Sequence, residues 1–356
     1  MIANVALLPG DGIGPEVCDG ALQALQAVAA RFSHEFRVQT HLIGGAAIDA
    51  AGEPLPAATV EACRGADAVF LGAVGGPRWD SLPPARRPEK GLLALRRALG
   101  VFCNLRPARA WPACLRASPL RPEVVAGADV MIVRELTGGA YFGEPRGRDS
   151  AQGRRRAFET GSYDEHEIAR VARLAFGIAR QRRRKVCSVD KANVLETSRL
   201  WREVVCEVAR DFPDVQLEHQ LVDSAAMRLC FAPASFDVLL TENLFGDILS
   251  DQAACLPGTV GLLPSASVGA GGPGLFEPVH GSAPDIAGRD MANPAGAILS
   301  AAMMLRHGLG LEQEARCMEA AVEAVLAGGV HTADLRPAKA AGTREFAAAV
   351  VREIAG

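Results

Sequence analysis

The chain has 356 residues, of which 49% are hydrophobic and 22% are charged, and its formal net charge is −3 with a pI near 6.2. This length is sufficient for two domains with large hydrophobic cores. The small net charge gives no support for binding to nucleic acid or to an anionic membrane, so a small molecule is the expected partner.

The cysteines and the N-terminus both indicate a cytoplasmic protein. Nine cysteines are scattered singly, without a Cys-x-x-Cys pair, and most stand among apolar residues. We interpret them as reduced thiols in the core. The first residues lead from an apolar segment into a Pro-Gly turn without the basic and cleavable stretches of a signal peptide. No stretch is apolar for the length that a membrane span requires.

The chain opens with a strand, a turn and a helix. Residues 5–8 form a short apolar strand, the glycine-rich PGDGIG follows at 9–14, and a helix is expected at 15–30 with Pro15 in its first turn. The turn is similar to a dinucleotide-binding fingerprint. However, G-x-G-x-x-G needs a third small residue where Pro15 stands, so the sequence does not fit a standard Rossmann motif.

Two further apolar segments, 101–105 and 129–133, each end at an arginine, Arg106 and Arg134. A guanidinium at such a strand end can hold a carboxylate through two hydrogen bonds, although for each arginine a solvated surface position remains the alternative. The other predicted strands lie at 68–72, 186–189, 217–222 and 236–241. Further helices are predicted at 165–181, 294–307, 312–327 and 343–354, together with one that begins at Leu92 and one that ends at Ala209.

Three segments are unusual in composition. Residues 136–162 are rich in Gly and Arg and poor in apolar residues, which predicts a projecting loop or hairpin. The basic runs at 154–156 and 180–185 have no interleaved aromatic residues, so we interpret them as solvated rather than as nucleic-acid contacts. Residues 257–281 are dense in Gly, Pro and Ser, which predicts a long functional loop.

The stretch TENLFGDILSD at 241–251 contains two aspartates, Asp247 and Asp251, four residues apart after an apolar strand. On a helix these carboxylates lie on one face, where like charges destabilise the helix unless a cation lies between them. The alternative is an ordinary helix N-terminus, at which aspartate is favoured by the helix dipole and needs no metal.

Several stretches together resemble the isocitrate/isopropylmalate family of β-decarboxylating dehydrogenases. They are LLPGDGIGPE (7–16), RPEKGLLALRR (87–97) with NLRP (104–107), VRELTGGAYFGEPRG (133–147), NLFGDILSD (243–251) and FEPVHGSAPDIAG (276–288). The last two are highly specific together, and the similarity covers nearly the whole chain. Glu242 before Asn243 and Leu221 before Val222 are unusual for the family, but they flank its motifs.

The resemblance implies an α/β, isopropylmalate-dehydrogenase-like fold of two domains, with a large mixed sheet flanked by helices, and not a true Rossmann fold. Domain 1 (1–101 and 258–356) would bind the cofactor, and domain 2 (102–257) would carry the metal carboxylates, the dimer interface and an arm at about 143–162. The active site is expected in the cleft between the domains. A homodimer with shared active sites is implied, to which the neighbouring subunit contributes Lys191 and Asp223.

The implied activity is oxidative decarboxylation of (2R,3S)-3-isopropylmalate to 2-oxoisocaproate and CO₂ with reduction of NAD, a step of leucine biosynthesis. The implied metal is Mg²⁺ or Mn²⁺, since aspartate oxygens suit these ions and no Cys/His cluster favours zinc. The alternatives are a sister dehydrogenase acting on D-malate, tartrate, isocitrate or homoisocitrate, and a non-catalytic regulatory subunit.

The family motifs also imply roles for individual residues. Leu92 offers an apolar surface to an isopropyl group, unless it is a core leucine, and Asp285-Ile286 replace the lysine and tyrosine of NADP-dependent relatives, which favours NAD. The implied sets are Tyr141 and Lys191 for proton transfer; Arg96, Arg106, Arg134, Asp223, Glu89 and Leu92 for substrate; Asp223, Asp247 and Asp251 for the metal; and Ile13, Asn193, Glu277, His280, Gly281, Ser282, Ala283, Asp285, Ile286 and Asn293 for the cofactor.

Overall fold

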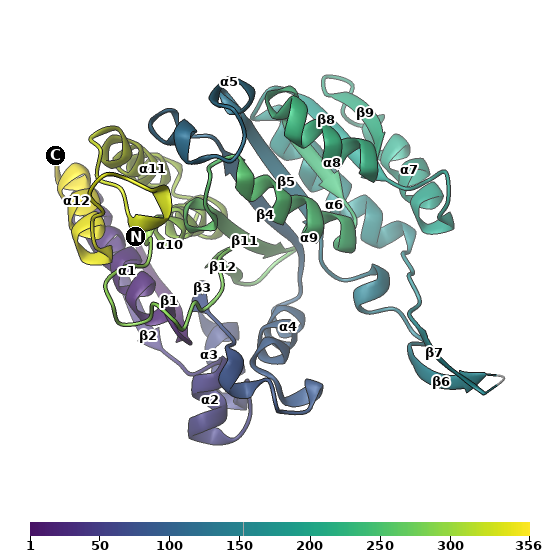
Figure 1. The fold of residues 1–356 in the computed structure, drawn as a ribbon, viewed down its shortest axis with the longest axis horizontal. Coiled ribbons are helices and arrows are strands. Elements are labelled where there is room, and N and C mark those ends of the chain that lie inside the picture. The colour runs from purple at the N-terminus through teal and green to yellow at the C-terminus, as the bar shows by residue number, and fades with distance from the viewer. Residues whose placement is uncertain (152) are drawn as a thin grey trace. The chain divides into compact units, whose positions relative to one another are not determined.

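The computed structural model describes residues 1–151 and 153–356, so Gln152 of the predicted arm lies outside the described residues. The structure is an α/β fold with a large mixed sheet flanked by helices, which confirms the predicted fold class (Figure 1). The chain divides into two compact units. Unit 1 comprises Met1–Val101, Trp111–Pro119 and Pro257–Gly356, and unit 2 comprises Phe102–Ala110 and Leu120–Leu256.

The strands and helices alternate along most of the described chain. The strands are β1 (Ile2–Gly10), β2 (Glu35–Thr40), β3 (Ala68–Ala73), β4 (Val101–Arg109), β5 (Asp129–Glu135), β6 (Gly147–Ala151), β7 (Arg154–Phe158), β8 (Lys185–Asp190), β9 (Gln216–Leu221), β10 (Val238–Thr241), β11 (Pro264–Gly269) and β12 (Gly274–Pro278). The α-helices are α1 (Gly14–Phe32), α2 (Gly44–Ala51), α3 (Ala57–Gly65), α4 (Pro88–Ala98), α5 (Pro122–Val125), α6 (Glu165–Arg180), α7 (Glu196–Ala209), α8 (Val222–Phe231), α9 (Asn243–Gln252), α10 (Ala295–Met303), α11 (Glu312–Ala327) and α12 (Thr343–Ala355).

Unit 1 is built on strands in the order β2-β1-β3-β12-β11, of which β11 alone is antiparallel to its neighbour β12. Helix α1 packs against α10 and α12, so the two ends of the chain share one helical layer (Figure 1). Helices α2, α3 and α4 form a second group. Helix α10 is buried along all nine of its residues, which explains its apolar and small composition.

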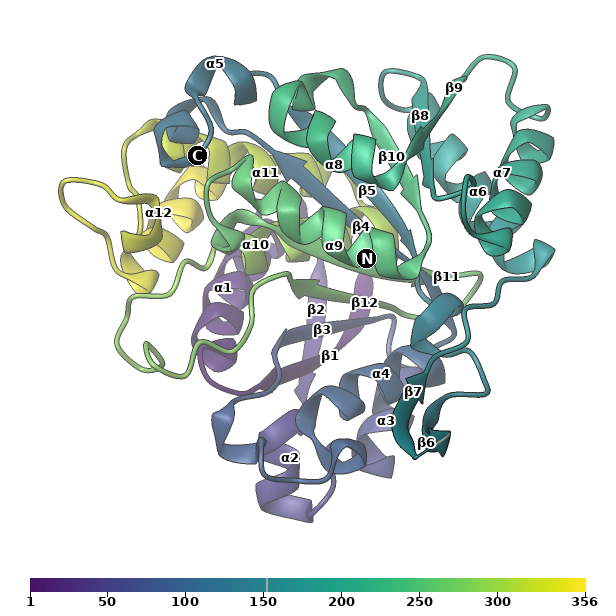
Figure 2. The same cartoon turned by 45° about the vertical axis from the view of Figure 1, so that its right-hand side comes forward.

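Unit 2 has the strand order β4-β5-β10-β8-β9, in which β4 is antiparallel to β5 and the others run parallel. Helices α8 and α9 lie on one face of these strands and α6 and α7 lie on the other (Figure 2). Strands β6 and β7 pair as an antiparallel hairpin that projects from the unit, as the Gly/Arg-rich composition predicted (Figure 1).

The prediction of one long loop at 257–281 was wrong, because the segment contains β11 and β12. The small residues that suggested a loop serve close packing instead. Ser265 and Ser267 are buried, and β11 packs against the fully buried α10. The solvent-facing strand β2 was not predicted either, because its sequence EFRVQT is largely polar and its residues are exposed or half-buried.

The basic run at 180–185 and the cysteines both differ in part from the predictions. The run at 180–185 is not simply solvated, because Arg182 pairs with buried Asp237 (2.8 Å) and with Asp129 (3.0 Å). Five of the nine cysteines are buried and three are intermediate, whereas Cys206 is exposed and does not fit the predicted core thiols. In the described part of the chain, no helix is long and apolar enough to cross a membrane.

Candidate functional site

The parallel pairing of β5 with β10 places Arg134 beside Thr241, directly before α9. The side chain of Arg134 is 4% exposed, so its charge needs partners within the protein. Its Nε and Nη2 donate to Oδ1 of Asn243 (3.1 and 2.8 Å), and its Nη1 donates to Oδ1 of Asp247. The strand end and the first turns of α9 therefore hold this guanidinium in a fixed orientation.

Arg106 reaches the same helix from β4. Its Nε donates to Oδ1 of Asn104 (2.7 Å), and its Nη1 donates to Oγ of Ser250 (2.8 Å) and to Oδ1 of Asp251 (3.2 Å). The same Nη1 lies 3.7 Å from Oδ1 of Asp247. One arginine thus contacts both aspartates, which shows that they share one face of α9, as the spacing predicted.

The two aspartates differ in their access to solvent. Glu242 caps the N-terminus of α9, since its Oε1 accepts a hydrogen bond from the amide of Phe245 (2.7 Å). Asp247 lies inside the helix with 32% of its side chain exposed, whereas 71% of Asp251 is exposed. Asp251 is therefore open to an ion from solution, and Asp247 is held between two guanidinium groups.

Tyr141 contacts this group from the short 3₁₀ helix Gly139–Tyr141. Its hydroxyl donates to Oδ2 of Asp247, and the guanidinium carbon of Arg134 lies 5.4 Å from the centre of its ring. Burial raises the pKa of the Tyr141 phenol, and the hydrogen bond to Asp247 raises it further. The phenol is consequently protonated at neutral pH and able to donate a proton.

Lys191 and Asp223 form a separate pair in unit 2. The Nζ of Lys191 donates to Oδ1 of Asp223, and this hydrogen bond lowers the pKa of the carboxyl. The pair does not complete a metal site with Asp247 and Asp251, because the described ranges 1–151 and 153–356 contain no group of three acidic, His or Cys side chains suited to an ion.

Of the predicted substrate residues in unit 1, Arg96 lies on α4 and donates through Nη2 to Oε1 of Glu277 on β12 (2.6 Å). Its Nε is buried and has no hydrogen-bond partner within the described residues. Glu89 lies on α4 beside Gly75, and Leu92 is half-buried on the same helix. The structure thus brings Arg96 together with Glu277, which the sequence had assigned to the cofactor.

The predicted cofactor residues of unit 1 come from two segments that meet. The amide of Ile13 donates to the carbonyl of Ser282 (2.7 Å), and a Cβ on Gly12 would lie 1.9 Å from the same oxygen. Only glycine allows this close approach, which Gly12 makes with a φ of +59°. Asp285 is exposed, Ala283 and Ile286 are half-buried, and Gly281 is exposed beside them.

His280 and Asn293 flank this segment. His280 contacts the carbonyl of Gly281 through Nδ1 (3.0 Å), while burial lowers the pKa of its imidazole and keeps it neutral. Asn293 donates to Asp334 (3.0 Å) and accepts from the amide of Ala295 (3.0 Å), so within the chain it fixes the start of α10. Asn193, the remaining predicted cofactor residue, is exposed in unit 2.

The structure also identifies residues to which the sequence gave no role. The buried carboxylate of Asp11 accepts hydrogen bonds from the amides of Gly45, Ala46 and Gly75, each at 2.8 Å. It therefore ties the PGDGIG turn to the first turn of α2 and to the loop that follows β3. Burial raises the pKa of Asp11. Its position as the single acidic residue of PGDGIG was the only signal in the sequence.

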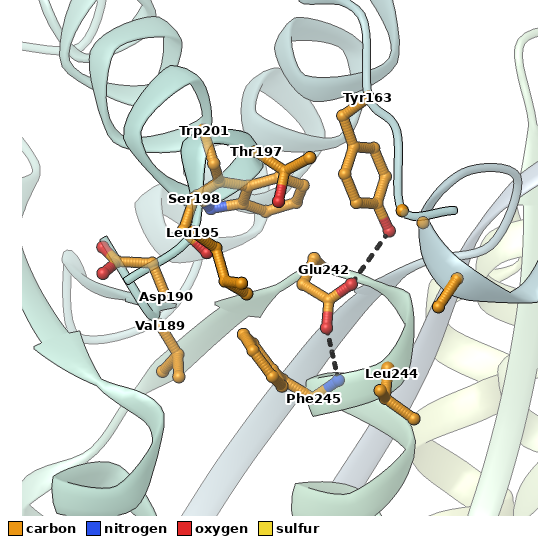
Figure 3. A pocket seen from close by; sticks show the side chains of 13 residues that line it. Tyr163, Val189, Asp190, Leu195, Thr197, Ser198, Trp201, Glu242, Leu244 and Phe245 are labelled. Atoms are coloured by element: carbon orange, nitrogen blue, oxygen red, sulfur yellow. Dashed lines mark hydrogen bonds between the residues drawn. The ribbon is translucent and has the colours of Figure 1, made fainter. Parts of the chain in front are cut away.

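A second unforeseen group surrounds a cavity of about 90 Å³ in unit 2 (Figure 3). The hydroxyl of Tyr163 donates to Oε2 of Glu242 (3.2 Å) and accepts from the amide of Asn243 (2.9 Å). The Tyr163 ring lies edge-on to Trp201, with 5.6 Å between centroids. A Cβ on Gly138 would lie 2.4 Å from this ring, so glycine is required in the segment that leads to Tyr141. These contacts brace the start of α9 and the approach to Tyr141.

The aspartates fit a hard divalent cation by their donor chemistry. Asp247 and Asp251 offer carboxylate oxygens alone, and Asp223 offers the same type of ligand from its separate position. Mg²⁺ and Mn²⁺ prefer oxygen ligands, whereas structural zinc sites are dominated by Cys and His.

Comparisons with known proteins agree with one another. The family model for isocitrate/isopropylmalate dehydrogenase matches residues 4–350. The 3-isopropylmalate dehydrogenase of Nitratidesulfovibrio vulgaris is 61% identical over 336 residues, which cover 94% of this chain and 94% of that protein. The 3-isopropylmalate dehydrogenase of Geobacillus kaustophilus is 60% identical, with 94% of this chain and 90% of the relative covered.

Solved structures give the same fold. The isocitrate dehydrogenase from Methylococcus capsulatus superposes with a TM-score of 0.88 at 35% identity, covering 99% of this chain and 100% of its own. A β-decarboxylating dehydrogenase from Thermococcus kodakarensis superposes with a TM-score of 0.81 at 37% identity, covering 99% and 96%.

Proposed function

The chain belongs to the isocitrate/isopropylmalate dehydrogenase family, and on this premise we propose that it catalyses NAD-dependent oxidative decarboxylation of 3-isopropylmalate in leucine biosynthesis. The observation that carries the proposal is the group of Arg106, Arg134, Tyr141, Asp247 and Asp251 around one helix. The two guanidinium groups can bind carboxylates, the protonated phenol can donate a proton, and the two aspartates can bind a metal cation.

The residues of this group have complementary tasks in the proposed reaction. Arg106 and Arg134, with Arg96 on α4, bind the carboxylates of the malate, and the contacts of Arg134 fix its orientation before substrate arrives. Lys191, as the neutral amine, accepts the proton of the C2 hydroxyl as hydride leaves. Tyr141 then donates a proton to the carbon from which CO₂ has departed, for which its raised pKa keeps it protonated.

The proposed cofactors are NAD and Mg²⁺ or Mn²⁺. When bound, NAD takes up the hydride, and the divalent cation supplies a Lewis acid that stabilises the negative charge left by decarboxylation. Asp223, Asp247 and Asp251 are the proposed ligands of the cation. Exposed Asp285 is suited to the ribose hydroxyls of NAD, and its charge repels the phosphate that distinguishes NADP. For the other predicted cofactor residues we propose the cofactor contacts that the family motifs imply.

The substrate is tested by steady-state assays at fixed NAD and Mg²⁺ on 3-isopropylmalate, D-malate, tartrate, isocitrate and homoisocitrate. We expect the highest kcat/KM for 3-isopropylmalate. Faster turnover of any other acid, with little NADH from 3-isopropylmalate, would establish a sister dehydrogenase. An enzyme that turns over none of them until a second protein is added would instead be a regulatory subunit.

We also propose a homodimer with active sites shared between subunits. Helices α8 and α9 expose large apolar side chains, namely Met227 (56%), Phe231 (75%), Leu244 (37%) and Ile248 (56%). Such a surface is typical of a protein interface. The separation of Asp223 from Asp247 and Asp251 within one chain agrees with a site that the partner completes.

Subunit mixing tests the shared site directly. Lys191→Ala and Tyr141→Phe are each expected to be nearly inactive as homodimers. After mixing and subunit exchange, a heterodimer would contain one site with both residues intact and would regain activity. Two inactive variants that form heterodimers but remain inactive would refute the sharing.

For the location we propose the cytoplasm, since all nine cysteines are free thiols.

A further inference from the structure

Cys206 differs from the other cysteines in its surroundings. It is exposed near the end of α7, whereas burial raises the pKa of Cys18 to about 12 and that of Cys63 and Cys114 to about 11. A buried thiol of this kind is inert because the reactive form is the thiolate. Burial does not suppress the reactivity of an exposed thiol, so the neighbouring side chains determine that reactivity.

The neighbour of Cys206 is an imidazole. His219, on the edge strand β9, places Nε2 3.2 Å from Sγ of Cys206, within hydrogen-bonding distance for sulfur. Burial, together with the charge of Arg202, lowers the pKa of His219 and keeps the ring neutral. A neutral ring has one nitrogen with a lone pair and one with a proton, so the tautomer determines whether Nε2 can accept a proton from the thiol.

The other ring nitrogen indicates the tautomer. Nδ1 of His219 is buried without a hydrogen-bond partner in the described part of the chain, and Oδ2 of Asp190 lies 3.9 Å from it. The carboxylate favours the proton on Nδ1, which leaves the lone pair on Nε2 facing Sγ. Asp190 is fixed in turn by Arg202, which donates to both carboxylate oxygens (2.9 and 2.8 Å).

We propose that Cys206 is a nucleophilic modification site for small disulfides, with His219 as its general base and the charge of Asp190 favouring the tautomer that this role needs. Nε2 of His219 takes the thiol proton, and Sγ attacks one sulfur of the disulfide. A new bond forms between Sγ and that sulfur while the disulfide bond breaks. The leaving thiolate takes up the proton, so one disulfide and one thiol give a mixed disulfide and one thiol without net oxidation.

The position of Cys206 connects this site to Lys191. The helix that carries Cys206 also carries Ser198, whose Oγ accepts from the amide of Lys191 (3.0 Å). Asp190 accepts from the amide of Ala192 (2.9 Å) as well as from Arg202. An adduct that displaces His219 or the end of α7 therefore disturbs the groups that hold the Lys191 turn, and we expect it to lower turnover. This consequence rests on the proposed function, whereas the reactivity of the thiol does not.

The reactivity is tested on the full-length reduced protein with glutathione disulfide, followed by mass spectrometry of the intact protein and of its peptides. We expect the first adduct at Cys206, and its formation should slow at least about tenfold in His219→Gln because a general base is lost. His166→Gln, at an exposed histidine of α6, is the matched control and should react as the wild type does. An unchanged first-adduct rate in Cys206→Ser, or equal rates in the two histidine variants, would overturn the proposal.

Turnover is measured in the same samples. The protein with one adduct should lose turnover several-fold, a reductant should restore it, and Cys206→Ser should be unaffected by glutathione disulfide. Full turnover by quantitatively modified protein would refute the connection to Lys191. If the protein has no dehydrogenase activity on any acid tested, the mass measurements still decide the reactivity of Cys206, so failure of the proposed function is distinguishable.

Discussion

Replacement of Tyr163 by Phe tests whether the braced start of α9 supports the reaction. Phenylalanine keeps the ring that packs against Trp201 and Gly138, and removes only the hydroxyl. The amide of Asn243 then loses its acceptor, and Glu242 loses a donor. Asn243 is the residue whose side chain holds Arg134, so the loss is transmitted to the guanidinium that we propose as a substrate ligand.

The magnitude follows from the burial of the affected groups. Asn243 is 1% exposed, and an unsatisfied buried amide costs about 1–3 kcal/mol. Glu242 is half-buried and retains the hydrogen bond from Phe245, so it adds little. With a loss of about 2 kcal/mol, Tm should fall by about 4–8 °C. The turnover number should fall further than folding explains, because Arg134 and Tyr141 both depend on this region.

The assay compares Tm, kcat and KM for wild type and Tyr163→Phe at a temperature where both are folded. Thr160→Val is a matched control, since it removes a hydroxyl that bonds to the carbonyl of Pro145 in the exposed arm and not at α9. We expect the control to keep kcat. If Tyr163→Phe kept both its Tm and its kcat, the brace would have no part in positioning Arg134, and the reasoning would be wrong.

Three further predictions concern the metal, the cofactor and pH. Asp251→Asn should weaken Mg²⁺-dependent turnover while Tm is retained, because the carboxylate is 71% exposed; equal losses in both would identify a structural residue. Asp285→Lys should raise the ratio of kcat/KM for NADP to that for NAD by about tenfold or more, since an ammonium attracts the extra phosphate, and an unchanged ratio would contradict the assignment. Burial lowers the pKa of His280, so its contribution to stability is complete above the ordinary value of 6.5 and is lost as pH falls below that value. Urea titrations from about pH 7.5 to about pH 5.5 should therefore show a smaller decline in the free energy of unfolding for His280→Gln than for the wild type.

The sequence predicted those strands and helices whose apolar residues follow a clear local pattern. The run at 236–241 and the spacing of Asp247 and Asp251 predicted β10 and α9, because a continuous apolar run and helical spacing are local properties. The strands β11 and β12 were missed, since their Gly, Pro and Ser residues have turn propensity and are placed in strands by packing against α10.

Groups formed by distant residues were beyond local patterns. Tyr163 and Glu242 are 79 positions apart and meet only because β10 leads α9 beneath the segment that precedes α6. The pairing of Cys206 with His219 depends likewise on α7 packing beside the edge strand β9. The family motifs gave roles to Arg134 and Tyr141 but none to Asn243, the first residue of NLFGDILSD, since a residue that orients another is recognised by its contacts and not by its chemistry.

The charges around the proposed metal ligands separate folding from metal binding. Arg106 and Arg134 offset Asp247, Arg106 also contacts Asp251, and Lys191 offsets Asp223, so none of these carboxylates depends on a cation to be tolerated in the fold. This differs from small zinc domains, in which unpaired ligands prevent folding until metal binds. An incoming cation would compete with the arginines that we propose as ligands of the substrate carboxylates. In this proposal substrate frees the aspartates by drawing the guanidinium groups to its own carboxylates, so substrate and cation should strengthen each other's binding.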